Sequence, residues 1–152
     1  MKHIYIYSGI IVSTLFTFIQ TNCQVITAQI SCGELIDKIT ILKIKAERIT
    51  DPEKLKNVCT ELETLQKICK ENITDYSLIA ELEKRLQHIN QELWDIEDAI
   101  RVKERHKEFD DEFVQIARSV YITNDKRCVV KKEIDRILGS RITEEKSYED
   151  IV

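Results

Sequence analysis

The sequence contains little that could form turns or sheets, with only three glycines and one proline among 152 residues. Such a composition leaves too few turn residues for β-hairpins, β-sandwiches or a glycine-rich phosphate-binding loop. One third of the residues are charged, and Glu, Lys, Leu and Ile recur at helical intervals. This pattern is typical of long amphipathic helices, so the sequence predicts an all-α fold.

The sequence also lacks the groupings that indicate metal, nucleic-acid or catalytic sites. Its five cysteines are scattered, without a CxxC or Cys/His cluster, so neither a disulfide framework nor a zinc site is predicted. The net charge of −4 is spread over both signs and provides no basic face for nucleic acid. No nucleophile–base pair can be identified. We therefore predict no catalytic residues, no metal and no cofactor.

Residues 1–25 form a segment of their own, for which three interpretations stay open. An apolar stretch runs from residue 4 to residue 19, short for a membrane span and diluted by Ser and Thr. It can be a secretory or anchor segment, a mis-called start upstream of the true one, or a buried helix. The scattered cysteines favour a cytoplasmic protein, and export or membrane anchoring through residues 4–19 is the alternative.

Apolar spacing predicts one helical bundle domain over residues 26–139, followed by a polar tail over residues 140–152. Four amphipathic helices are expected, at about 32–49, 52–70, 76–107 and 110–138, the third being the longest. Their apolar residues alternate in steps of three and four, which is the spacing of coiled-coil seams. Short connections favour antiparallel neighbours, so we expect an up-down bundle or a pair of helical hairpins. Regular seams also make a homodimer or a helical protein partner plausible.

The first helix begins with two acidic residues that need different explanations. Glu34 fits a capping box, in which Ser31 caps the helix and Glu34 bonds back to the Ser31 amide. Asp37 lies on a second stripe, opposite the main seam, and a covered carboxylate there needs a cation or several amides. We expect Arg118 or Arg101 to supply that cation.

Further polar residues lie beside the apolar stripes of the third and fourth helices. Glu92 and Asp95 repeat the spacing of Glu34 and Asp37 but face solvent, so no metal site is predicted there. Asn124 falls within the apolar arc of the fourth helix, where a buried amide must find partners. These anomalies form either an internal network or a ligand site. The candidate ligand-binding residues are Asp37, Trp94, Glu97, Arg101, Arg118, Tyr121, Asn124, Asp125 and Arg127.

Three stretches, "GELIDKITILKIKAERI", "LWDIEDAIR" and "ARSVYITNDKR", resemble a small bacterial family of unknown function. The likeness covers about residues 26–149 and includes most of the candidate site residues. It implies a compact, all-helical cytoplasmic protein without an assigned activity, and it supplies no roles for the matching positions. Similar members begin just before the "ITAQIS" segment, which favours the mis-called start, with Val25 as the true initiator.

Two functional hypotheses follow. The first is a non-enzymatic helical binding or scaffold module that acts through helix–helix association. The second is a small enzyme or ligand sensor with a polar pocket between the first, third and fourth helices. That pocket would bind an anionic metabolite such as a nucleotide or sugar nucleotide, and it requires its polar residues to converge. Contact with a membrane is expected only if the N-terminal leader is real and retained.

Overall fold

The computed structural model describes residues 26–147, and these residues form four α-helices and no strand. The helices are α1 (Cys32–Arg48), α2 (Pro52–Asn72), α3 (Ala80–His106) and α4 (Asp111–Leu138), with a short 3-10 turn, η1 (Tyr76–Leu78), before α3. The predicted all-α class is therefore confirmed. The leader at residues 1–25, with its three interpretations, lies outside the described residues, as do the last five residues of the tail. None of the described helices is both long and apolar enough to span a membrane.

Side-chain caps fix where three of the helices begin. Ser31, Asp51 and Asp110 each accept a bond from the backbone amide three residues on, at 3.1, 2.9 and 2.9 Å. Pro52 occupies the first turn of α2, where its missing N–H costs nothing. α4 ends at Gly139, whose φ of 63° is the left-handed conformation that favours glycine. These positions agree with the sequence-based boundaries.

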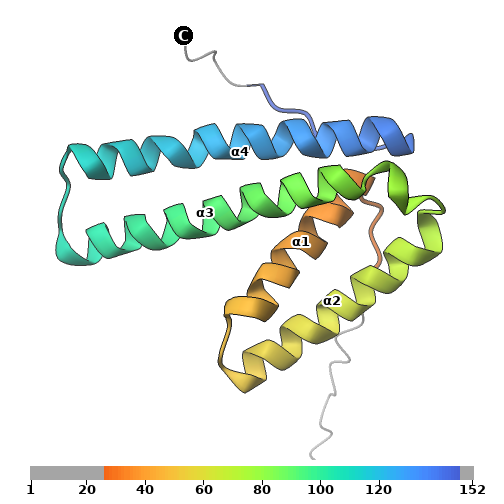
Figure 1. Cartoon of the computed structure of the whole chain (residues 1–152), viewed down its shortest axis with the longest axis horizontal. Coiled ribbons are helices and arrows are strands. Elements are labelled where there is room, and N and C mark those ends of the chain that lie inside the picture. Colours follow the sequence, from red (N-terminus) through yellow and green to blue (C-terminus); the bar gives the residue numbers. More distant parts are fainter. Residues whose placement is uncertain (1–25, 148–152) are drawn as a thin grey trace, which may run out of the picture.

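The expected third helix differs at its start. Asp75 caps the 3-10 turn η1 through the amide of Ser77, and the α-helix begins only at Ala80. α3 therefore has 27 residues, whereas α4 has 28, so the prediction that the third helix is the longest is wrong. The turn between them begins with Lys107, which caps the end of α3 in the left-handed conformation, at φ 60°. The two helices are closely matched in length and lie antiparallel (Figure 1).

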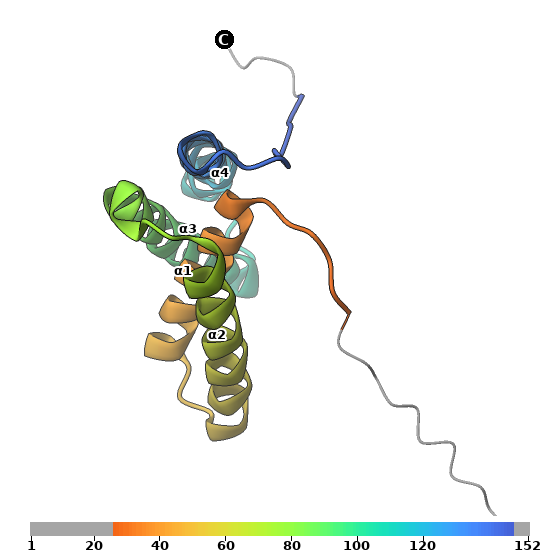
Figure 2. The ribbon, with the colours of Figure 1, turned by 90° about the vertical axis from the view of Figure 1, so that its right-hand side faces the viewer.

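The four helices form two antiparallel hairpins, α1–α2 and α3–α4, which diverge from one another (Figure 1). α1 packs against both α3 and α4, and we call this region the crossing. Viewed end on, α2 lies on the side of α1 away from α4 (Figure 2). The architecture is thus the hairpin pair, with neither hairpin alongside the other over its full length.

The hydrophobic core lies at the crossing and extends to the end of α2, where that helix packs against the crossing. Its buried members are Leu35, Ile36, Ile39, Cys69, Ile73, Ile79, Leu86, Ile89, Val130 and Ile134. Beyond the crossing the burial stops abruptly. Asn90 is the last buried residue of α3 and Thr123 the first of α4, so no residue from 91 to 122 is buried. We call this segment, residues 91–122, the α3–α4 arm.

Candidate functional site

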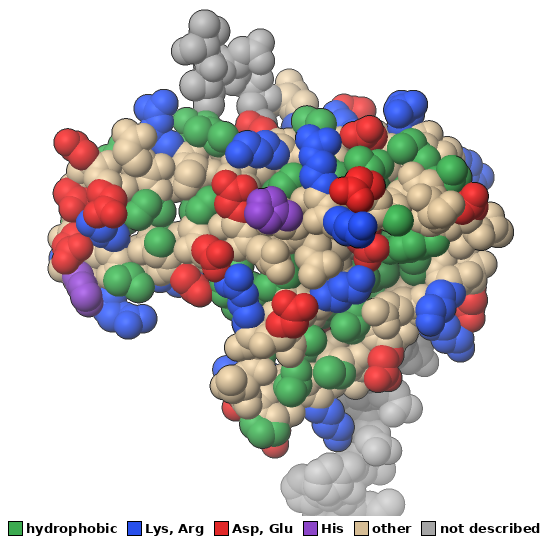
Figure 3. Space-filling view, viewed as in Figure 1, with side chains coloured by type: hydrophobic (Ala, Val, Ile, Leu, Met, Phe, Trp, Pro, Cys, Tyr) green, Lys and Arg blue, Asp and Glu red, His purple; other side chains and the backbone are tan. Residues whose placement is uncertain are grey.

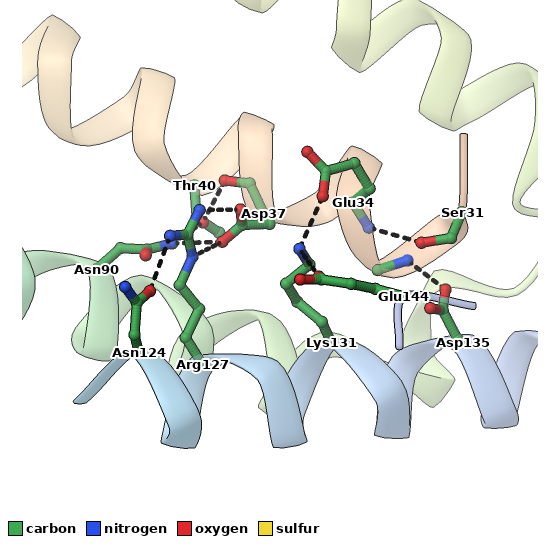
Figure 4. Close-up of polar contacts among 11 residues, drawn as sticks. Ser31, Glu34, Asp37, Thr40, Asn90, Asn124, Arg127, Lys131, Asp135 and Glu144 are labelled. Atoms are coloured by element: carbon green, nitrogen blue, oxygen red, sulfur yellow. Dashed lines mark hydrogen bonds and ion pairs between the residues drawn. The ribbon is translucent and has the colours of Figure 1, made fainter. Parts of the chain in front are cut away.

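The centre of the crossing is an ion pair between Asp37 of α1 and Arg127 of α4 (Figure 4). The Asp37 side chain is 1% exposed. Arg127 donates from Nε to Oδ1 at 2.8 Å and from Nη2 to Oδ2, so the guanidinium holds both carboxylate oxygens. The hydrogen bond to Asp37 raises the pKa of Arg127 above its ordinary value, against the effect of burial. The pair joins α1 to α4 at this point, and removing one partner would leave the other charge uncompensated in a poorly solvated place.

Asn90 and Thr40 complete the coordination of Asp37. Asn90 donates from Nδ2 to Asp37 Oδ1 and to Thr40 Oγ1, both at 2.9 Å. The Thr40 hydroxyl donates to the Asp37 backbone carbonyl at 2.8 Å. Among residues 26–147, no deeply buried side-chain nitrogen or oxygen lacks a hydrogen-bond partner. The polar groups of this network therefore satisfy one another's hydrogen bonds. We call such a network closed.

Another cation of α4, Lys131, is buried one turn further along the helix. It is 8% exposed and binds Glu34 at 2.7 Å and Glu144 of the tail at 2.5 Å (Figure 4). Burial opposes the charge of Lys131, but the bonds to Glu144 and Glu34 outweigh it and raise the pKa of the ammonium. The same bond to Lys131 lowers the pKa of Glu144. Lys131 thus ties the start of α1 and the C-terminal tail to α4.

The start of α1 packs directly on the backbone of α4. The Gly33 amide donates to the buried carboxylate of Asp135 at 2.6 Å, which satisfies an amide that the helix itself leaves free. A Cβ added at Gly33 would meet the Lys131 backbone, with its carbonyl carbon at 3.0 Å and its Cα at 3.1 Å. Gly33 is therefore required by this close approach.

A cavity of about 440 Å³ adjoins the ion pair, between α1, α3 and α4. Its apolar wall includes Ile41, Leu93 and Val120, and Trp94 adds an aromatic ring. Its polar lining consists of Lys45, Asn90, Glu97, Asp98, Arg101, Asn124 and Arg127. Three of these side chains are cationic and two anionic, so the lining has little net charge.

The structure places the nine candidate residues in three groups. Trp94, Glu97, Arg101, Asn124 and Arg127 line the cavity. Asp37 lies buried behind it, bound by Arg127. Arg118, Tyr121 and Asp125 are absent from the cavity lining, and Arg118 and Asp125 are exposed on α4. The nine residues therefore do not converge on one pocket.

Two of the predicted contacts are wrong. The cation of Asp37 is Arg127, because Arg101 binds Glu97 on its own helix at 2.6 Å and Arg118 is exposed on α4. Ser31 does cap α1, but the Glu34 carboxylate binds Lys131 rather than closing the capping box. A cation on the neighbouring helix attracts Glu34 more strongly than a neutral amide.

Four residues of the network are absent from the predicted site residues: Thr40, Asn90, Lys131 and Asp135. One signal could have found two of them. Asn124, Arg127, Lys131 and Asp135 are spaced by three and four residues, which places them on one side of α4. This polar stripe faces α1, and reading it as a unit would have predicted a polar contact between the two helices.

The fold and its centre define an all-helical protein with a closed ionic network between two hairpins. Within residues 26–147 no three His, Cys, Asp or Glu side chains are grouped as a metal site. The chain belongs to DUF6165, a family of unknown function, whose model matches residues 26–152. The motifs had indicated an uncharacterised family, and this match confirms it. No curated protein and no solved structure matches the chain.

Proposed function

We propose that the protein is a non-enzymatic helical binding module that associates with another helical surface through the α3–α4 arm. One observation carries the proposal, which is that no residue from 91 to 122 is buried although the arm carries a regular apolar seam. Helices in proteins owe most of their stability to packing of an apolar face. An arm of two helices hides that face only partly, and a partner would complete its burial.

The apolar side chains on the outside of the arm support this proposal. Val102, Phe109, Val114 and Ile122 are each between 45% and 58% exposed. Acidic and basic side chains are interspersed on the face seen in Figure 3, with no large patch of one sign. A surface on which apolar residues lie among charges of both signs is better suited to binding another protein than to binding a polyanion.

The second candidate function is a ligand sensor, reduced to the five predicted residues that do line the cavity beside Trp94. Its volume of about 440 Å³ is within the range of small-molecule sites. Its electrostatics argue against a nucleotide or sugar nucleotide, because Arg127 is bound to Asp37 and Arg101 to Glu97. Lys45 is the lining cation that forms no ion pair with a residue between 26 and 147, and Asp98 shares the lining. A thermal-shift screen with nucleotides, sugar nucleotides and divalent metals tests this function, and a reproducible shift would support it.

Site-specific photo-crosslinking in cells tests the proposed association. A photoreactive amino acid is placed at Val102 or Val114 on the arm, and at the exposed Lys56 on α2 as the matched control. We expect discrete adducts from the two arm positions and none from Lys56. The proposal is wrong if the arm positions give no more adduct than Lys56. The mass of an adduct then tells whether the partner is another copy of the chain.

We also propose that the protein works in the cytoplasm. All four described cysteines are free thiols, two of them buried, Cys69 and Cys128. Burial is the largest effect on Cys69 and raises the pKa of its thiol, which makes it a poor nucleophile. Free thiols persist in reducing compartments. Fractionation of cells that express the full chain tests this proposal, and recovery outside the cytoplasm would contradict it.

A further inference from the structure

The outer face of α4 carries a stripe of side chains that belong neither to the hydrophobic core nor to the lining of the cavity. Its main members recur every three or four residues, so they share one side of the helix. We call it the α4 outer stripe, and it consists of Val114, Arg118, Tyr121, Ile122, Asp125 and Val129. Val114, Ile122 and Val129 are 48%, 45% and 57% exposed. α4 forms one edge of the molecule, with the other three helices on one side of it (Figure 1).

The two charges of the α4 outer stripe have no partners within residues 26–147. Arg118 and Asp125 are exposed, and neither side chain forms an ion pair or a hydrogen bond with a described residue. They are seven residues apart, which is about 10 Å along the helix and too far for them to pair with each other. By contrast, Lys103 on the facing helix binds three carboxylates.

The α4 outer stripe is symmetric about the point between Tyr121 and Ile122. Arg118 precedes this point by as many residues as Asp125 follows it, and the same holds for Val114 and Val129. Two antiparallel copies of α4 that meet there place Arg118 opposite the partner's Asp125, and Val114 opposite the partner's Val129. Both charge pairs form at once, because a two-fold axis repeats every contact.

The alternative arrangement of two such helices lacks this complementarity. A parallel pair in register sets Arg118 against the partner's Arg118 and Asp125 against the partner's Asp125, and like charges repel. The antiparallel pair also brings Asp111 opposite the partner's Lys132, which binds Glu145 of its own tail at 2.8 Å. The contact spans residues 111–132, about 30 Å of helix.

We propose that the partner of this protein is a second copy of itself, bound antiparallel through the α4 outer stripe with reciprocal Arg118–Asp125 ion pairs. This inference rests on the proposed association function and names its partner. In the dimer, the exposed valines pack against each other and Tyr121 packs against the partner's Ile122. The two-fold axis passes between the α4 helices, and each arm points away from the axis.

Charge reversal tests the dimer in the full chain. Arg118→Asp sets two carboxylates against each other on both sides of the two-fold axis, so the dimer dissociates at least about tenfold more readily. Adding Asp125→Arg in the same chain recreates both pairs with their signs exchanged, and the double variant regains the affinity. Light scattering over a dilution series under reducing conditions measures the mass of each variant. Lys56→Asp makes the same change of net charge on exposed α2 and leaves the dimer unchanged.

The results that overturn the dimer are distinct from those that overturn the association function. A wild-type mass of one chain throughout the series rules out this dimer. A dimer that resists Arg118→Asp, or is not restored by Asp125→Arg, rules out this contact. If crosslinking at Val102 or Val114 then yields an adduct with a different protein, the association function stands and the self-association fails. Circular dichroism of each variant confirms that the helices are retained.

Discussion

The crossing and the α3–α4 arm are built from the same two helices, yet they hold together in different ways. At the crossing, α3 and α4 meet α1, and Leu86 and Ile134 are fully buried. Along the arm the helices meet only each other, and no residue between 91 and 122 is buried. The difference shows that a third helix, rather than the quality of the heptad seam, decides how much of these helices is protected from water.

The ion pairs of the two regions also differ in how far they are buried. Asp37 at the crossing is 1% exposed, and its pair with Arg127 is enclosed by Asn90 and Thr40. On the arm, Glu97 and Arg101 form a pair whose side chains are 44% and 64% exposed. Pairs of the first kind are strongly destabilising when broken, whereas pairs of the second kind contribute little.

The largest effect is expected from Asp37→Asn, which leaves the Arg127 guanidinium, on a side chain only 26% exposed, without its counter-charge. We expect the free energy of unfolding to fall by about 3–5 kcal/mol, measured by urea denaturation followed by circular dichroism. The matched variant on the arm, Glu97→Gln, should change it by less than about 1 kcal/mol. Equal effects from the two variants would show that the crossing has no energetic advantage over the arm.

Truncation of apolar side chains gives the second comparison. Leu86→Ala at the crossing removes a fully buried side chain and should cost about 3 kcal/mol of stability. Ile100→Ala lies on the same seam of α3 but is only half-buried, so about 1 kcal/mol is expected. If Ile100→Ala destabilises the chain more at high than at low protein concentration, a partner covers the arm in solution. The same cost for both truncations would contradict the difference in burial.

The smallest effect concerns the attachment of the tail beside the crossing. The bond to Lys131 lowers the pKa of Glu144 below its ordinary value of 4.5. Its stabilising contribution is therefore complete above about pH 4.5 and is lost as the pH falls through the folded-state pKa. We expect the amides of residues 141–147 to lose protection on acidification, once their exchange rates are divided by the intrinsic rates at each pH, with a change in free energy of under about 1 kcal/mol. Glu144→Gln should show fast exchange already at neutral pH, and an unchanged rate would refute the role of this pair.

Helix positions were predictable because their signals are local. Ser31, Pro52 and Gly139 each mark a boundary through their own backbone chemistry. The start of the third helix was not, since Asp75 can cap either an α-helix or the 3-10 turn that the structure contains. Ile79, which directly follows the 3-10 turn, is buried in the core, and contacts of that kind cannot be derived from local sequence.

The partner of Asp37 could not be derived in the same way. A helical wheel shows that Asp37 and Arg127 each lie on a definite side of their helices. It does not show which turn of α4 lies opposite a given turn of α1, and a shift by one turn exchanges Arg127 for Lys131 or Asn124. The register is set by the contact of Gly33 with the Lys131 backbone and by the bond from the Gly33 amide to Asp135. Both belong to the packed state alone.

Because burial ends abruptly at Asn90, the arm projects from the crossing and small changes of angle at its base become large displacements at its tip. From Asn90 to His106, α3 extends about 24 Å beyond its last buried residue. A tilt of about ten degrees at the crossing therefore displaces the tip of the arm by about 4 Å, at a rise of 1.5 Å per residue. The contacts of Asp37 with Asn90 and Arg127 lie where the arm leaves the crossing, so the angle at which the arm projects depends on them.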